Sequence, residues 1–400
     1  MTKETKLKIG VFVPATLGML TAFGPFVTDF YLPSMPEMAE YFKTSPAAVS
    51  TSLTAGMIGL AAGQILIGPL SDKYGRRRPL ILSMALFSIA SVLCMLSPNI
   101  HVFNAFRVLQ GIGGAGGVVL AKSFATDMFR GKALADFLAL LGAINGIAPI
   151  CAPIIGGTLT NFTSWQGVFC VLLAVGVILL VCSLRLRETL PPERRTTKSL
   201  ASSYANIFGV LRNRRFTLST VAMMCCFFTF FAYITASPFI FQSIYGLSPF
   251  EYSLCFGLNA FCIGIGALLP TRFHHPNTAM KWASIDMVAA SLLVGVCQVL
   301  HAPLAMLMPC YIYMLLCFGM MQPVTTAIAM DSERNNAGAA SAVFGASNFV
   351  AGALVSPLVT MGDILVTSGC VMFVGAVGCA AFAIPLSNAI KREALAKAEQ

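Results

Sequence analysis

The sequence predicts an all-α membrane protein with twelve transmembrane helices arranged as two six-helix bundles. Of its 400 residues, 57% are hydrophobic and 10% are charged, and the mean hydropathy is +0.79. Soluble domains contain about 25% charged residues, and one water-soluble core does not bury so much apolar side chain. In addition, long apolar segments recur along the chain with basic residues between them. Lipid is therefore the expected solvent for much of the chain.

Twelve apolar segments approach the length of about 20 residues that a helix needs to cross a bilayer. The first half contains six, near 9–31, 47–70, 79–97, 102–124, 134–158 and 165–186. The second half contains six more, near 216–241, 250–270, 280–300, 302–326, 338–360 and 364–388. The pair that meets at VLHAPLAML is the hardest to divide. The first segment is too long for a cleaved signal peptide and no small-residue cleavage site follows it, so it is expected to be a span.

The longest polar interval divides the spans six and six. It predicts an N-terminal bundle at 1–186, a cytoplasmic linker at 187–215 and a C-terminal bundle at 216–400. Equal halves suggest an internal duplication, a common plan among secondary transporters. GAIN at 142–145 and GASN at 345–348 occupy matching places in spans five and eleven and support it.

The net charge of +10 reflects membrane topology rather than a nucleic-acid partner. With both termini in the cytoplasm, every Lys and Arg except Lys43 and Arg107 falls in or beside an inner segment, as the positive-inside rule requires. We therefore expect a multi-pass protein of the bacterial cytoplasmic membrane, in contact with lipids and not with nucleic acid.

No metal site, cofactor or enzymatic centre is expected. The thirteen cysteines are scattered through apolar runs, which is typical of small packing residues rather than a disulfide framework. The four histidines show no metal-ligand spacing. GIGGAGG, at 111–117, matches GxGxxG but lies inside an apolar helix, where small residues favour helix packing over dinucleotide binding.

Charges inside spans are costly and usually functional, and two stand out. Asp29 lies near the outer end of the first span and Arg107 one to two turns into the fourth, at similar depth, where they can pair. Burial disfavours the charged carboxylate and a nearby cation favours it, so Asp29 is the candidate protonation site and Arg107 its modulator. A purely structural ion pair is the alternative. Asp286, nearer an inner helix end, is expected to be structural or interfacial.

Two motifs resemble those of the major facilitator superfamily of secondary transporters. GPLSDKYGRRRP, at 68–79, resembles its loop between spans two and three, G-x-x-x-D-[RK]-x-G-[RK]-[RK]. The matching residues are Gly68, Asp72, Lys73, Gly75, Arg76 and Arg77. RVLQGIGGA resembles its span-four motif, R-x-x-Q-G-x-G-x-A, at Arg107, Gln110, Gly111, Gly113 and Ala115.

Further stretches resemble drug/proton antiporters of that superfamily. GAINGIAPICAPIIGG resembles their span-five motif, although Ala148 precedes Pro149 where a glycine is usual. The matching residues are Gly146, Pro149, Pro153, Gly156 and Gly157. TDFYLPSMPEM and RETLPPERR resemble the bicyclomycin/chloramphenicol-resistance (Bcr/CflA) group of multidrug exporters. The similarity runs through most of the N-terminal half and is thinner in the C-terminal half.

The resemblance implies roles for these motifs. Asp72 would dock at the start of span eleven near NNAGAAS as a conformational latch, joined by Arg76 when the cavity faces outward. Gly68 would allow close helix contact and Gly75 a tight turn. The alternative is a basic loop that only fixes the membrane topology, but this does not explain why Asp72, Gly68 and Gly75 occur at the spacing of the motif. The span-five prolines and glycines would form a kinked gate that limits proton leak.

The resulting expectation is a monomeric, proton-coupled exporter of drugs or other small amphipathic compounds, driven by the proton gradient without a cofactor. The candidate cavity contacts are Tyr31, Asn145, Tyr233, Asn259 and Asn348. A carrier dedicated to one metabolite, such as an amino acid or sugar, is the first alternative. A transport-dead sensor on the same fold is the second.

Overall fold

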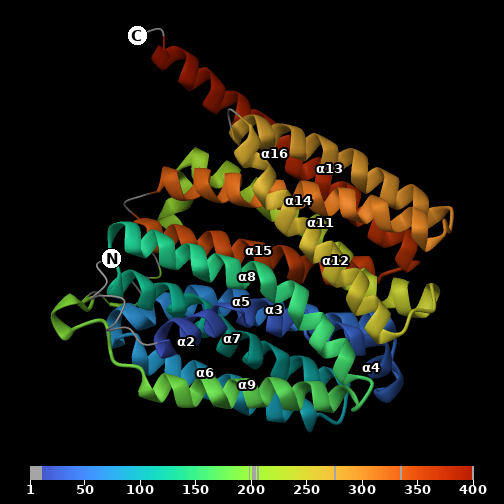
Figure 1. Cartoon of the computed structure of the whole chain (residues 1–400), viewed down its shortest axis with the longest axis horizontal. Coiled ribbons are helices and arrows are strands. Elements are labelled where there is room, and N and C mark those ends of the chain that lie inside the picture. The colour runs from blue at the N-terminus through green and yellow to red at the C-terminus, as the bar shows by residue number, and fades with distance from the viewer. Residues whose placement is uncertain are drawn as a thin grey trace. The chain divides into compact units, whose positions relative to one another are not determined.

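The computed structural model describes residues 11–197, 199–200, 204, 207–273, 276–333 and 336–398. The chain divides into two compact units, unit 1 (Met1–Ala205) and unit 2 (Asn206–Gln400). Both are built from helices, with no β-strand among the residues described (Figure 1), which confirms the predicted all-α class. Residues 1–10, Lys198 and Arg334, which the sequence predicts to be cytoplasmic, lie outside the described residues. His274 and His275 lie outside them as well.

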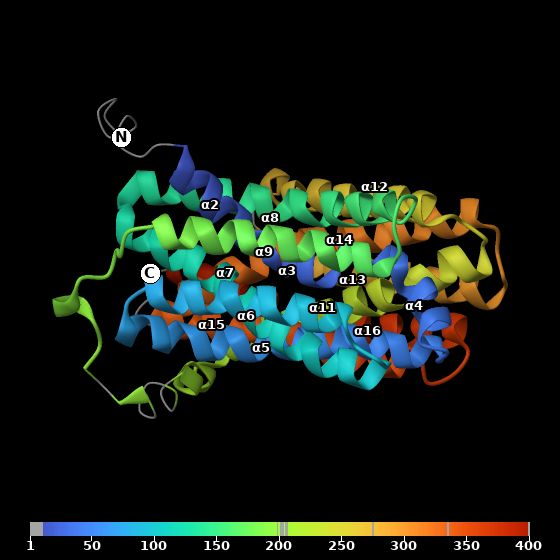
Figure 2. The same ribbon diagram turned by 90° about the horizontal axis from the view of Figure 1, so that it is seen from below.

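The described part of unit 1 contains five helices that are long and apolar enough to cross a membrane, within a few residues of the predicted spans two to six. They are α5 (Pro46–Tyr74), α6 (Arg77–Met95), α7 (Ile100–Met128), α8 (Gly131–Leu159) and α9 (Trp165–Arg185). Neighbours in this set pack in pairs, α5 against α7 and α6 against both α7 and α9 (Figure 2).

The predicted first span, 9–31, is divided into two short helices rather than one. These are α2 (Phe12–Thr21) and α3 (Phe23–Thr28), and a turn of 3₁₀ helix (Leu32–Ser34) leads from them into α4 (Met35–Tyr41). Pro25 explains the break, because it has no N–H to donate to the carbonyl four residues earlier, that of Thr21, the last residue of α2. The described chain thus has eleven full-length spans plus this divided one.

The described residues of unit 2 form the other six spans, all close to their predicted positions. They are α11 (Arg214–Pro238), α12 (Pro249–Leu268), α13 (Pro276–Val299), α14 (Leu304–Ser332), α15 (Ala337–Val359) and α16 (Ile364–Ala398). A π-helical segment, Phe239–Ile244, extends α11. The division at VLHAPLAML is confirmed, because α13 ends at Val299 and α14 begins at Leu304.

Glycines set the closest helix contacts in unit 1. A Cβ added to Gly59 of α5 would meet the backbone of α7, and one added to Gly111 of α7 would meet the carbonyl of Gly56. Gly113 faces α6, where a Cβ would lie 2.7 Å from the backbone nitrogen of Phe87. The glycine run of α7 therefore serves helix packing, as the sequence predicts.

The second and fourth spans of unit 2 pack in the same way. A Cβ on Gly266 of α12 would meet the carbonyl of Leu316 in α14, and one on Gly319 of α14 would meet the carbonyl of Ile263 in α12. The same pair of spans in each half is thus joined through reciprocal glycines. This repetition supports the internal duplication.

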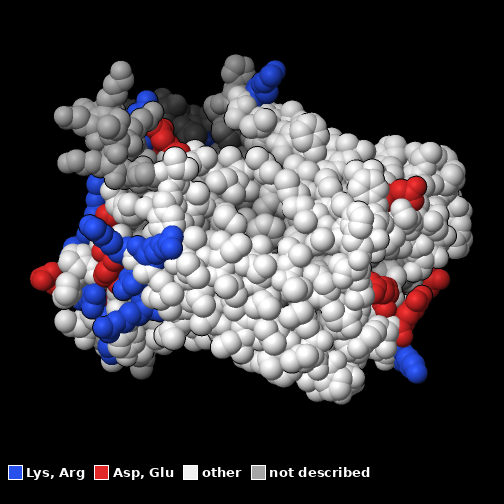
Figure 3. All heavy atoms as spheres, turned by 60° about the horizontal axis from the view of Figure 1, so that its bottom comes forward, with Lys and Arg blue, Asp and Glu red and all other residues white. Residues whose placement is uncertain are grey.

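Charge is distributed unevenly between the two ends of the unit 1 helices. On the face shown in Figure 3, Lys and Arg gather at one end, and a broad surface without charged residues separates them from the other end. The basic end comprises the α5–α6 turn, the α7–α8 turn and the end of α9, with Lys73, Arg76, Arg77, Arg78, Arg130, Lys132, Arg185 and Arg187. The opposite end carries Glu37, Glu40 and Lys43 around α4. The basic end is the one that the positive-inside rule assigns to the cytoplasm.

Candidate functional site

Arg107 is the centre of a buried polar cluster in unit 1. Its side chain, on α7, has no exposed surface. Its guanidinium donates to the side-chain oxygen of Gln110. It also donates to the backbone carbonyl of Val27, at a distance of 2.5 Å. Gln110 in turn donates to Ser91 Oγ on α6 at 2.8 Å. A buried charge is stable only when polar partners replace water, and these contacts tie α7 to α3 and α6.

Aromatic rings complete the environment of Arg107. Its guanidinium carbon lies 4.4 Å from the centre of the Tyr31 ring and 5.8 Å from that of Phe169, which is within cation–π range. Tyr31 is itself buried and its hydroxyl lies 2.8 Å from Ser52 Oγ on α5. Gly56 leaves the space that the guanidinium occupies, because a Cβ there would lie 2.9 Å from Arg107 Nη2.

The end of α3 explains why Arg107 binds Val27. Val27 lies in the last turn of α3, which ends at Thr28, and the carbonyls of a last helical turn lack helical donors. A cation at this end is also favoured by the helix dipole. Arg107 thus caps the C-terminal end of α3 by donating to one of its last carbonyls.

Asp29 lies directly after α3 and is 3% exposed. Its Oδ1 has no hydrogen-bond partner among the described residues. The predicted salt bridge between Asp29 and Arg107 is not formed among the described residues, whereas Arg76 pairs with both Asp72 and Asp127. The reason is that Arg107 donates to Val27 and Gln110 rather than to the carboxylate. The two residues share the end of α3, but they do not form a salt bridge.

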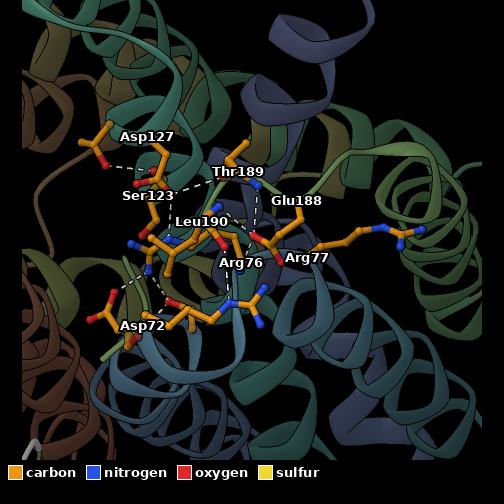
Figure 4. Close-up of polar contacts among 12 residues, drawn as sticks. Asp72, Arg76, Arg77, Ser123, Asp127, Glu188, Thr189 and Leu190 are labelled. Carbon is orange, nitrogen blue, oxygen red and sulfur yellow. Dashed lines mark hydrogen bonds and ion pairs between the residues drawn. The ribbon is translucent and has the colours of Figure 1, made fainter. Parts of the chain in front are cut away.

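A second cluster forms at the basic end of unit 1, around the α5–α6 turn (Figure 4). Arg76 Nη1 donates to Asp72 Oδ1 at 2.5 Å and to Ser71 Oγ at 2.7 Å, and its Nε donates to Asp127 Oδ2 at 2.9 Å. Asp127 lies at the end of α7 and also accepts from Thr189 Oγ1 at 3.2 Å. Arg76 therefore joins α5, α7 and the segment that follows α9.

Glu188 caps the start of α6 from that segment. One of its carboxylate oxygens accepts the backbone N–H of Arg76 at 2.8 Å, and the other accepts that of Arg77 at 3.1 Å. Gly75 makes this approach possible, because its φ of +88° favours glycine and a Cβ there would collide with the Glu188 carboxylate. The tight turn predicted at Gly75 is thus present.

Sequence reasoning did not identify Glu188 or Asp127 as parts of this cluster. Asp127 lies in the last turn of α7 and Glu188 follows α9 by three residues. Both acids therefore lie at the basic end of unit 1. That placement was an available signal, since acids among bases at helix ends commonly pair or cap.

The pKa of Glu188 leads to a testable prediction. Burial raises this pKa, but backbone N–H groups of Leu190, Arg76, Arg77 and Thr189 donate to the carboxylate and outweigh burial, so the pKa lies below the usual glutamate value. Glu188→Gln is expected to destabilise the protein by about 1 kcal/mol, since hydrogen bonds to a charged acceptor and a favourable helix-end charge are lost.

The contribution of Glu188 should depend on pH with a definite sign. A lowered folded-state pKa stabilises the protein above the unfolded-state pKa of about 4.3, and this stabilisation is lost as the pH falls through the folded-state value. Thermal unfolding in detergent should therefore show a gap between wild type and Glu188→Gln at pH 7 that narrows on acidification. Glu193→Gln, at an exposed acid in the same segment, is the control. An equal gap at all pH values would contradict this role.

The other predicted site residues are distributed as follows. The close helix contact expected at Gly68, and the docking of Asp72 on span eleven, would join unit 1 to unit 2, so both stay predictions. Lys73 Nζ lies 5.7 Å from the Tyr74 ring centre. In α8, Pro149 and Pro153 lie within a continuous helix, and Gly157 is buried. Gly146 and Asn145 are exposed.

Gly156 and three predicted cavity residues are more closely packed. A Cβ on Gly156 would meet the backbone carbonyl of Phe30, which fixes α8 against the first span. In unit 2, Asn259 donates to the Tyr233 hydroxyl at 2.8 Å and both are buried. Asn348 is half-buried and its side-chain oxygen has no partner among the described residues.

Comparison with known proteins agrees with this architecture. The chain matches the sequence model of the Major Facilitator Superfamily over residues 17–356. It is 38% identical over 368 residues to the uncharacterized MFS-type transporter YdgK of Bacillus subtilis, covering 90% of this chain and 92% of that one. It is 29% identical to the bicyclomycin resistance protein homolog of Haemophilus influenzae, covering 86% and 87%.

Two further similarities bear on function and fold respectively. Multidrug resistance protein D of Escherichia coli is 27% identical, covering 85% of this chain and 86% of the relative. The crystal structure of a D-xylose-proton symporter superposes with a TM-score of 0.72 at 16% identity, covering 93% of this chain and 97% of that one. With the helical architecture and the family match together, the chain belongs to the Major Facilitator Superfamily of transporters and is a multi-pass protein of the bacterial cytoplasmic membrane.

Proposed function

We propose that this transporter exports drugs or other small amphipathic compounds in exchange for protons, by alternating access. The observation that carries the proposal is Asp29, a buried carboxyl at the end of α3 whose Oδ1 finds no partner among the described residues. The names of two relatives, a bicyclomycin resistance protein homolog and a multidrug resistance protein, support the substrate class.

Asp29 suits proton coupling because the cost of its charge depends on its surroundings. Ionising a buried carboxyl is unfavourable when few polar partners replace water, whereas the protonated form is tolerated. In the proposal, Asp29 takes up a proton from the outside and releases it when the inner side opens. Each elementary charge that crosses the membrane supplies about 2.3 kcal/mol per 100 mV.

Arg107 provides the link between protonation and conformation in this proposal. Its guanidinium holds the carbonyl of Val27, two residues before Asp29. When Asp29 is ionised, the carboxylate competes with that carbonyl for the guanidinium, and the end of α3 shifts relative to α7. The Arg107 cluster and the Arg76 cluster would then form and open in alternation, with Arg76 and Asp72 acting as the latch at the basic end.

Reconstituted vesicles with an imposed pH gradient test the proposal. Addition of chloramphenicol or a lipophilic cationic drug is expected to cause proton movement, followed as a change of internal pH, in vesicles that contain the protein. No proton movement with any drug, together with a response to one amino acid or sugar, would replace the proposal with a dedicated metabolite carrier. No flux with either class would favour the transport-dead sensor.

A further inference from the structure

Two thiols meet between α13 and α14, away from the polar clusters of unit 1. Cys297 lies near the end of α13 and Cys310 lies six residues after the start of α14. Their sulfur atoms are 3.8 Å apart, and both residues are partly exposed. Two free thiols this close together, each partly exposed, are placed to form a disulfide with each other after a small approach.

Hydrogen bonds between the next residues fix the register of this pair. Gln298, directly after Cys297, donates to the hydroxyl of Tyr311, directly after Cys310, at 2.9 Å. The same amide lies 3.1 Å from Ser368 Oγ of α16. Gln298 and Tyr311 are buried, so this contact holds the two helices at the height where the thiols face each other.

The connection between the helices is also held in place. Only residues 300–303 separate α13 from α14. The N–H of Ala302 donates to the carbonyl of Cys297 at 2.9 Å, and the hydroxyl of Tyr245 donates to the carbonyl of Ala302 at 2.7 Å. The geometry of the thiol pair is therefore defined from both sides.

We propose that Cys297 and Cys310 form a redox-active dithiol that closes to a disulfide when a disulfide oxidant reaches the α13–α14 turn. A disulfide has an S–S distance of about 2.05 Å, so closure requires side-chain rotation and a small approach of the sulfurs. This dithiol is independent of the proposed export function, and it departs from the packing role expected for all cysteines from their scatter in the sequence.

The chemistry is a thiol–disulfide exchange in two steps. The thiolate of one cysteine attacks a sulfur of the external disulfide, forms a mixed disulfide and releases one external thiolate. The thiolate of the second cysteine then attacks the first cysteine's sulfur and releases the second external thiolate. The protein dithiol is oxidised by two electrons, the external disulfide is reduced to two thiols, and the two cysteine protons pass to the leaving thiolates.

The position of the pair matches an oxidant on the outer side. The α13–α14 turn lies at the opposite end of α13 from the α12–α13 connection, which carries Arg272 and is expected to face the cytoplasm. Disulfides persist outside the cytoplasmic membrane, where the environment is oxidising, and not in the reducing cytoplasm.

The test uses the purified full-length protein in detergent, incubated with oxidised glutathione, alkylated and digested for mass spectrometry. The expected result is a peptide pair linked through Cys297 and Cys310. In Cys297→Ser, Cys310 should instead carry glutathione, because the second thiol is missing. Cys370 is the matched control, since it is exposed and lies six residues after the start of α16, as Cys310 does in α14.

Three results would overturn the proposal. Glutathione on both Cys297 and Cys310 of the wild type, without a link, would show that the thiols do not close. Lack of modification at both while Cys370 reacts would show that oxidants do not reach them. A link from either cysteine to a different cysteine would show that the pair is not the preferred one.

Discussion

Asp29→Asn is expected to abolish proton-coupled drug transport while leaving the protein folded in the membrane. Asparagine has nearly the shape of the protonated carboxyl but does not ionise, so the carrier would lose its coupling step. Because Asp29 Oδ1 has no hydrogen-bond partner in the described structure, the substitution breaks no hydrogen bond at that oxygen and keeps the volume of the side chain. The measurement is drug-induced change of internal pH in reconstituted vesicles, together with drug resistance of cells that express the variant.

The control for this variant is Glu40→Gln. Glu40 is an exposed acid on α4, at the same end of unit 1, and its neutralisation should leave transport near the wild-type level. Proton-driven export that survives Asp29→Asn at the wild-type rate would remove Asp29 from the mechanism. Equal loss in both variants would point to an effect of outer-end charge rather than of one proton site.

The second large effect is expected for Arg107→Met. This substitution keeps an extended side chain but leaves the Val27 carbonyl and the Gln110 side-chain oxygen without their donor, inside a region with no exposed surface. A buried polar group that loses its partner costs about 1–3 kcal/mol, and the cation–π contact with Tyr31 is lost as well. We expect a lower Tm in detergent and loss of transport.

Two further variants separate the contribution of the positive charge of Arg107 from that of its planar guanidinium group. Arg107→Lys keeps the charge but not the planar group that reaches two acceptors at once, so an intermediate Tm is expected. Arg78→Met, at an exposed base of the same unit, controls for loss of one positive charge. A wild-type Tm in Arg107→Met would show that the cluster does not hold α3 and α7 together.

Most of the architecture could be predicted because membrane spans have a simple cause. Runs of apolar residues of one length, broken by bases at one end, fix the number and position of helices. The divided first span was not predicted, although Pro25 was visible in the sequence. Proline in a span often leaves the helix continuous, as Pro149 and Pro153 do in α8, and the pattern alone does not distinguish the two outcomes.

The candidate site was predictable in part for a related reason. Arg107 and Asp29 stand out as charges in apolar surroundings, but depth in a span does not give the direction of a side chain. The acceptor of Arg107 is a backbone carbonyl of Val27, which no sequence letter marks. The cap from Glu188 joins residues 112 positions apart, and neither side of that contact indicates the other.

The docking of the segment after α9 on the α5–α6 turn also has a consequence for biosynthesis. Besides the contacts of Glu188, the N–H of Thr196 donates to the carbonyl of Asp72 at 3.0 Å. At translation rates of about 5–20 residues per second, the start of α6 waits on the order of ten seconds for its cap to be made. The first half of the protein therefore completes its fold only when the ribosome has passed Thr196, and a chain released at residue 186 would lack that closure.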